Sequence, residues 1–128
     1  MSTAGLVRAG DGESGTAGIR RVLIVGAGLI GTSIGLALRQ RFVDVALEDH
    51  APGRLALATE LGAGRPSAAG ERFDVAVVAV PPAAVASELL RLQRLDLART
   101  YTDVASAKAE PQREAELTGV DMSTYVGG

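Results

Sequence analysis

The stretch RVLIVGAGLIGTSIGLALRQ, residues 21–40, places three glycines directly after a run of apolar residues. Gly26, Gly28 and Gly31 form the pattern G-x-G-x-x-G. When it lies at the turn between a strand and the following helix, this pattern is typical of a loop that binds the pyrophosphate of a dinucleotide. The same pattern also occurs in tight turns that bind nothing, so the surrounding sequence must decide between the two interpretations.

Each glycine of the pattern has a separate predicted role. Gly26 permits the tight turn, Gly28 lacks the Cβ that would collide with an approaching pyrophosphate, and Gly31 lets the helix lie close to the strand. The backbone N–H groups around Leu29 and Ile30 are expected to be unpaired first-turn donors that face the anion, aided by the helix dipole.

The remainder of the chain alternates apolar runs with Ala- and Leu-rich segments, which predicts parallel βαβ units. We therefore expect an α/β fold, a doubly wound parallel sheet of the Rossmann type, as one dinucleotide-binding domain over residues 19–128. Residues 1–18 are expected to be a flexible leader. The expected strands are 21–25, 43–49, 64–67, 73–80, 100–104 and 123–126. The expected helices are 29–42, 52–61, 81–95 and 108–117, with Gly62 and Gly64 after the second helix as a C-terminal stop.

Composition excludes several classes of function. The 128 residues are 47% hydrophobic and carry a net charge of -2 with scattered basic residues, so no nucleic-acid partner is indicated. The chain has no cysteine, which excludes disulfides, thiolate nucleophiles and cysteine-based metal sites and favours a cytoplasmic location. No apolar run approaches the ~20 residues of a membrane helix, so no membrane partner is expected.

An acidic residue at the end of the second expected strand supports dinucleotide binding. Asp49 lies 18 residues after Gly31, where dinucleotide-binding folds place a carboxylate against the adenosine ribose. Acids at strand ends are also common in solvated loops, so Asp49 is informative only together with the glycines. A carboxylate there repels a 2′-phosphate and favours NAD, whereas Arg54 and His50 nearby keep NADP as an alternative.

Three motifs give residues 21–128 a resemblance to the dinucleotide-binding half of a prephenate dehydrogenase. Residues 26–33 match the G-x-G-L-I-G-x-S form of the glycine motif, and Val80 and Pro81 match a hydrophobic-Pro pair that ends strand four in that family. The segment TDVASAK resembles the family pattern T-D-x-G-S-x-K, with Ala105 in place of the usual glycine.

The resemblance implies an enzyme of tyrosine biosynthesis. It would convert the small molecule prephenate to 4-hydroxyphenylpyruvate by oxidative decarboxylation with NAD(P). The charge of Asp49, and not the resemblance, favours NAD over NADP. In that family a C-terminal helical domain binds substrate and forms a homodimer. We expect that domain to lie outside this sequence.

The resemblance also assigns roles to residues near the C-terminal end of the sequence. Ser106 would be a supporting catalytic residue that lies beside the nicotinamide and hydrogen-bonds a catalytic histidine, although capping is its alternative role. That histidine follows a glycine pair in the family, and this sequence stops at Gly127 and Gly128, so we expect the chain alone to be inactive. His50 is expected at the adenosine end, and Lys108 is interpreted as a solvated or phosphate-facing charge.

Other functions remain open from the sequence. An arogenate or cyclohexadienyl dehydrogenase would differ in substrate-side residues outside the chain. A β-hydroxyacid dehydrogenase or a pyrroline carboxylate reductase has a similar N-terminal half, but the segment TDVASAK argues against both. A non-catalytic NAD-binding module is the alternative of a different class.

Overall fold

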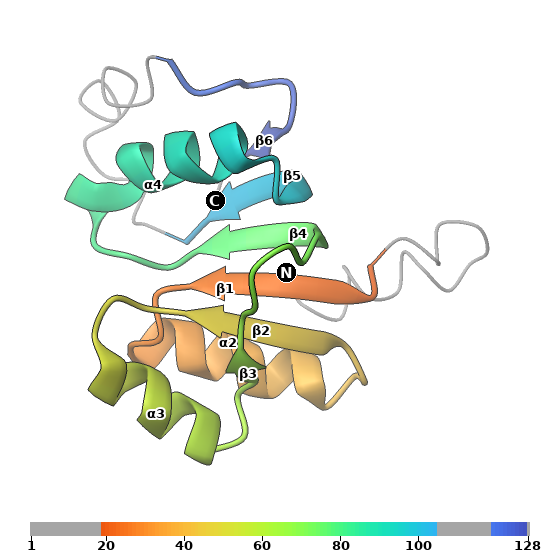
Figure 1. The fold of residues 1–128 in the computed structure, drawn as a ribbon, viewed down its shortest axis with the longest axis vertical. Coiled ribbons are helices and arrows are strands. Elements are labelled where there is room, and N and C mark those ends of the chain that lie inside the picture. The colour runs from red at the N-terminus through yellow and green to blue at the C-terminus, as the bar shows by residue number, and fades with distance from the viewer. Residues whose placement is uncertain (1–18, 105–118, 128) are drawn as a thin grey trace.

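The computed structural model describes residues 19–104 and 119–127, which fold around one parallel sheet (Figure 1). The strands are β1 (Arg21–Val25), β2 (Asp44–Glu48), β3 (Arg65–Pro66), β4 (Phe73–Val78), β5 (Ala98–Asp103) and β6 (Tyr125–Val126), and the helices are α2 (Leu29–Arg39), α3 (Pro52–Glu60) and α4 (Pro82–Leu95). The strand order is β3-β2-β1-β4-β5-β6 and every pair is parallel. The predicted doubly wound α/β fold is confirmed. No helix in the described ranges has the length and apolar character to cross a membrane.

Helices cover both faces of the sheet, so the two central strands carry continuous apolar runs, residues 22–25 in β1 and residues 75–78 in β4. On one face, Leu23 of β1 lies in a buried cluster with Leu89 and Leu92 of α4. On the other face, Ile24 shares a cluster with Leu38 of α2. Burying each of these side chains contributes roughly 1.5–3 kcal/mol. This two-sided burial explains why β1 and β4 have continuous rather than alternating hydrophobic patterns.

Pro52 and Pro82 occupy the first positions of α3 and α4, so α3 begins at the expected residue and α4 begins one residue after the expected 81. A missing N–H costs nothing there, since the first amide groups of a helix have no partner within it. After α3, Gly62 adopts a φ of +91° and its N–H donates to the carbonyl of Thr59 at 3.0 Å. This left-handed glycine ends the helix shortly before the short strand β3.

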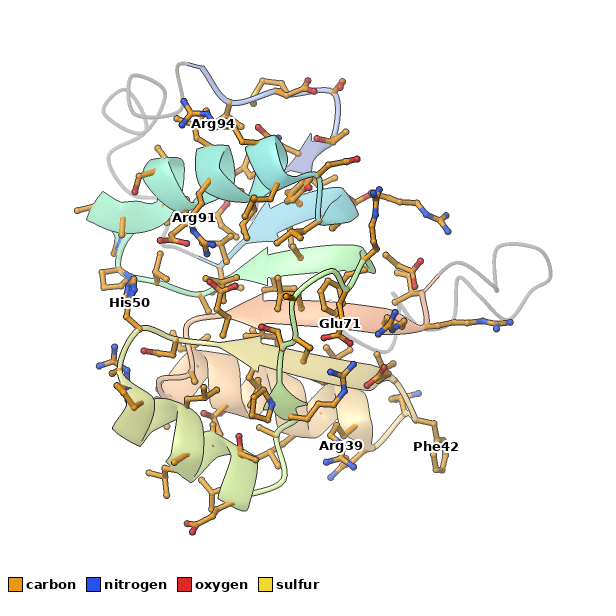
Figure 2. All side chains as sticks on the ribbon, viewed as in Figure 1. Arg39, Phe42, His50, Glu71, Arg91 and Arg94 are labelled. Atoms are coloured by element: carbon orange, nitrogen blue, oxygen red, sulfur yellow. The ribbon has the colours of Figure 1, made fainter. Side chains whose placement is uncertain are left out.

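Several boundaries differ from the sequence expectation by a few residues, and two of these differences affect the core and the cavity. Helix α2 ends at Arg39 rather than at residue 42, because Phe42 takes a φ of +63° and the chain turns there to place Val43 in the core. Phe42 is 96% exposed and points away from the sheet (Figure 2). Strand β4 ends at Val78, so Val80 and Pro81 belong to the connection before α4 and not to the strand.

The strand order creates a switch point between β1 and β4. The chain proceeds from β1 to β2 and β3 on one side and then crosses to β4 on the other side of β1. The connections that leave β1 and β4 therefore diverge at the carboxyl edge of the sheet. In open α/β sheets, ligands bind in the crevice at this position.

A charged cluster on the opposite, amino-terminal edge ties several segments together. Arg21 contacts Asp44 at 3.2 Å and Glu71 at 2.7 Å, and Arg65 contacts the same two acids at 3.0 and 2.8 Å. Figure 2 shows Glu71 in front of the sheet beside these strands. Hydrogen bonds from Arg65 are the main cause that lowers the pKa of both Asp44 and Glu71 from their usual values.

Substitution of Arg65 tests this cluster. Arg65→Gln is expected to lower the free energy of unfolding by about 1 kcal/mol at neutral pH, the upper end for exposed ion pairs. The stability that depressed carboxyl pKa values provide is present above the unfolded pKa of about 4 and is lost as the pH falls through the lower folded values. The difference from wild type should therefore shrink below a pH of about 4.

Urea unfolding followed by circular dichroism at neutral and acidic pH measures both effects. Arg94→Gln is the matched control, because Arg94 lies exposed in the last turn of α4. An Arg65 effect of equal size at both pH values would contradict the assignment.

Candidate dinucleotide site

The first glycine of the motif shapes the turn that leaves β1. Gly26 has a φ of +109°, and an added Cβ would lie 2.4 Å from the backbone oxygen of Ala79. Its N–H donates to the carbonyl of Glu48 at 2.8 Å. The turn is thus held between the ends of β2 and β4, and only glycine combines this conformation with this approach.

The other two glycines of the motif differ sharply in their surroundings. A Cβ on Gly31 would lie 1.9 Å from the carbonyl oxygen of Gly26, so α2 packs directly on the turn. A Cβ on Gly28 would meet no atom of the described residues within 4 Å. Gly31 therefore serves packing, whereas Gly28 leaves space that described protein atoms do not fill.

The N-terminus of α2 is open to a ligand. Gly28 is its N-cap, no side chain caps the helix, and the first turn contains no acidic residue. Leu29 and Ile30 follow in that turn and are 85% and 57% exposed. The first amide groups of a helix have no intrahelical acceptor and carry the positive end of the helix dipole. This end of α2 can therefore bind an anionic group.

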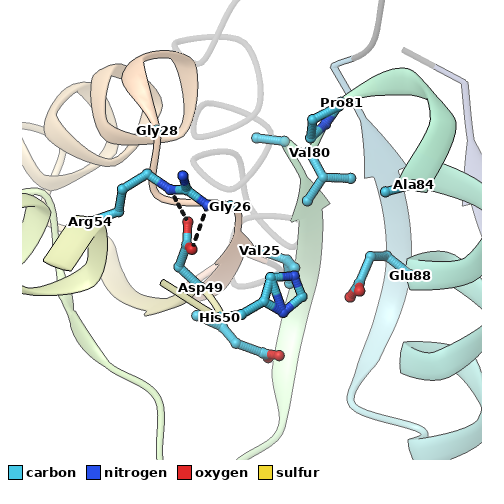
Figure 3. A pocket seen from close by; sticks show the side chains of 12 residues that line it. Val25, Gly26, Gly28, Asp49, His50, Arg54, Val80, Pro81, Ala84 and Glu88 are labelled. Atoms are coloured by element: carbon cyan, nitrogen blue, oxygen red, sulfur yellow. Dashed lines mark hydrogen bonds and ion pairs between the residues drawn. The ribbon is translucent and has the colours of Figure 1, made fainter. Parts of the chain in front are cut away.

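A cavity of about 280 Å³ adjoins this helix end at the switch point. It lies at the carboxyl ends of β1, β2 and β4, and Figure 3 shows Asp49, His50 and Arg54 on one side and Val80, Pro81, Ala84 and Glu88 on the other. Its remaining lining residues are Val25, Gly26, Gly28, Glu48 and Ala79. The structure thus brings Gly26, Gly28, Asp49, Val80 and Pro81 of the predicted site together around one cavity.

Asp49 joins three segments at the wall of this cavity. Its carboxylate accepts hydrogen bonds from the N–H groups of Ala27 at 2.7 Å and Ala51 at 2.8 Å. Both oxygens also accept from Arg54, at 3.1 Å from Nε and 3.0 Å from Nη2. Burial alone would raise the pKa of Asp49, but the hydrogen bonds from Arg54 and the two amides outweigh it and lower the pKa. The side chain is 3% exposed and is charged.

This structural role of Asp49 is not evident from the sequence. Ala27 is 22 positions away along the chain, and only the parallel pairing of β1 and β2 brings the two together. The Arg54 contact spans five residues across the start of α3. The only sequence signal for it was the position of Asp49 two residues before Ala51, at the start of the helix that Pro52 begins, where an Asp side chain can accept from the backbone N–H two residues later.

A second ionic cluster lies on the other face of β2. Arg91 of α4 contacts Glu48 at 2.5 Å and Glu88 at 2.7 Å. Consecutive side chains along a strand point to opposite faces of the sheet. Glu48 therefore faces α4, whereas the next residue, Asp49, faces the other side. The spacing of Glu88 and Arg91 on one helix was the sequence signal for this cluster.

Ser106, which the resemblance places beside the nicotinamide, lies outside the described residues, and so does Lys108. Asp103 ends β5, is 1% exposed and accepts a hydrogen bond from the hydroxyl of Tyr125 on β6. His50 follows β2, three strand positions away from β5. At ~4.8 Å per strand this is roughly 14 Å, so His50 does not lie beside Asp103.

The topology, the glycine turn and the cavity at the switch point define a Rossmann-type nucleotide-binding domain. Residues 34–128 match the family described as prephenate dehydrogenase, nucleotide-binding domain. The chain is also 46% identical over 110 residues to "Probable prephenate dehydrogenase NovF" of Streptomyces niveus, covering 86% of this chain and 30% of that protein. The chain therefore belongs to the prephenate dehydrogenase family, through that family's nucleotide-binding domain.

Solved structures agree with this assignment. A Corynebacterium glutamicum protein whose name places it among the prephenate dehydrogenases superposes with a TM-score of 0.68 at 27% identity, over 84% of this chain and 36% of that chain. The 3-hydroxyisobutyrate dehydrogenase of Mycobacterium tuberculosis superposes with a TM-score of 0.59 at 17% identity, over 85% of this chain and 39% of that chain. The second likeness shows the shared fold alone. The chain spans about a third of the length of these relatives.

Proposed function

We propose that the cavity beside α2 binds NAD, with the pyrophosphate at the N-terminus of that helix. The observation that carries this proposal is the open space at Gly28, next to a helix end without a side-chain cap. A turn that served only packing would need Gly26 and Gly31 but not a third glycine whose Cβ position is empty. Amide groups near Leu29 and Ile30 would donate to the pyrophosphate oxygens.

We place the adenosine ribose against Asp49. Its carboxylate borders the same cavity and is ionised, which suits it to accept hydrogen bonds from a ribose diol. The same negative charge disfavours a 2′-phosphate, so NAD is the proposed cofactor ahead of NADP. Val80 and Pro81 would bound the cofactor from the connection after β4.

In the whole protein we propose the oxidative decarboxylation of prephenate to 4-hydroxyphenylpyruvate, a step of tyrosine biosynthesis in the cytoplasm. Bound NAD would supply the hydride acceptor. The substrate ring carbon would lose its hydride as its hydroxyl proton passes to a histidine base, and loss of carbon dioxide would leave an aromatic ring. Ser106 would orient that histidine, and a helical domain would hold the substrate and form the homodimer.

The increase in NADH absorbance tests the proposed reaction. We expect NAD reduction with prephenate from a polypeptide that joins this domain to a helical substrate domain, and no turnover from residues 1–128 alone. The rate should exceed that with arogenate, and Ser106→Ala should lower kcat by about 10-fold or more, because general base catalysis contributes ~10²–10⁴-fold. Faster turnover of arogenate would reassign the substrate, and full activity of Ser106→Ala would remove its role.

A further inference from the structure

The carboxylate of Asp49 is fully engaged within the protein. Oδ1 accepts from the N–H of Ala51 and from Nη2 of Arg54, and Oδ2 accepts from the N–H of Ala27 and from Nε of Arg54. A carboxylate offers about four lone-pair sites. All of them have a donor in this structure, so a ribose diol must displace one donor to reach Asp49.

Arg54 is the donor that can leave. The N–H of Ala27 belongs to the buried glycine turn, and the N–H of Ala51 belongs to the N-cap of α3, so neither moves without the backbone. The Arg54 side chain is 57% exposed, and its flexible aliphatic part extends from the first turn of α3. Figure 3 shows it reaching over Asp49 at the edge of the cavity.

We infer that Arg54 sets the discrimination between NAD and NADP by moving between Asp49 and the cofactor. This inference rests on the proposed dinucleotide site. When NAD binds, the ribose diol replaces the Arg54 fork on Asp49. When NADP binds, the guanidinium stays close to Asp49, offsets its charge and donates to the 2′-phosphate. Arg54 therefore opposes NAD and favours NADP.

The charges around the cavity support a special role for this arginine. Among the described residues that line the cavity, Arg54 is the only arginine or lysine. Three carboxylates, those of Glu48, Asp49 and Glu88, line the same space, and Arg91 contacts the two glutamates from outside the lining. Without Arg54, a 2′-phosphate beside Asp49 would face negative charge with no cation from the lining.

Calorimetric titration of the full chain with NAD and with NADP tests the inference. Arg54→Gln is expected to weaken NADP by about 10- to 100-fold, the effect of losing a charge-assisted hydrogen bond, and to leave NAD unchanged or tighter. Arg54→Lys keeps the charge and should retain NADP binding within about 10-fold of wild type. Arg94→Gln is the matched control and should change neither, because Arg94 lies exposed in the last turn of α4, six positions after Glu88, the last residue of that helix that lines the cavity.

The outcomes separate this inference from the proposed function. If NAD and NADP are weakened by the same factor in Arg54→Gln, or if wild type binds NAD but not NADP, the inference is wrong and the NAD site stands. If wild type binds neither nucleotide, the proposed site itself is wrong. Circular dichroism of each variant confirms that the fold is retained.

Discussion

Gly28→Val is expected to abolish measurable NAD binding while the domain stays folded. The glycine has an extended backbone, with φ of -80° and ψ of -158°, which valine adopts without strain. Its Cβ would meet no atom of residues 19–104 and 119–127 within 4 Å, so the side chain enters the cavity that we assign to the pyrophosphate. Loss of two or more charge-assisted hydrogen bonds weakens binding by more than about 100-fold.

The free energy of unfolding should change by about 1 kcal/mol or less in this variant, the cost of an apolar residue at an N-cap. Urea unfolding and NAD calorimetry on the same preparation measure both quantities. Gly28→Ala is the graded control, since its single methyl group should weaken NAD less than valine does. Undiminished NAD binding by Gly28→Val would place the pyrophosphate elsewhere.

A substitution at Gly31, in contrast to one at Gly28, is expected to lower the stability of the fold. Gly31→Ala should destabilise the fold by about 3 kcal/mol or more, because the new Cβ would lie 1.9 Å from the carbonyl oxygen of Gly26. This atom belongs to a turn fixed between β2 and β4, so α2 must move as a whole to relieve the overlap.

The midpoint of urea unfolding measures this effect. Gly53→Ala is a suitable control, because Gly53 also lies in a helix and a Cβ there would meet nothing within 4 Å in the part of the chain that the structure describes. A Gly31→Ala protein as stable as wild type would show that α2 does not pack on the turn as described.

Local patterns predicted most of the fold because each strand and helix carries its own signal. The continuous apolar run of β1 and the prolines at the starts of α3 and α4 are contained within short segments. The short strand β3 was expected at residues 64–67 and lies at Arg65–Pro66. The end of α2 was placed too late because the left-handed conformation of Phe42 has no signal in its residue type.

The site could be predicted only in part, because its main contacts join distant segments. The positions of Gly28 and Asp49 follow from motif spacing. The hydrogen bond from Ala27 to Asp49 and the ion pair of Arg91 with Glu48, 43 residues apart, follow only from the sheet order. The sequence therefore suggested Asp49 as a ribose ligand, but it did not suggest that Asp49 links the glycine turn to the start of α3 through hydrogen bonds.

The central claim is that the cavity at the carboxyl ends of β1 and β4 binds NAD through the turn at Gly28. Titration of the wild-type chain and of Gly28→Val with NAD in a calorimeter tests it most directly. We expect saturable binding of one NAD per wild-type chain and no binding by the folded variant. Equal binding by both proteins, or none by the wild type, would contradict it.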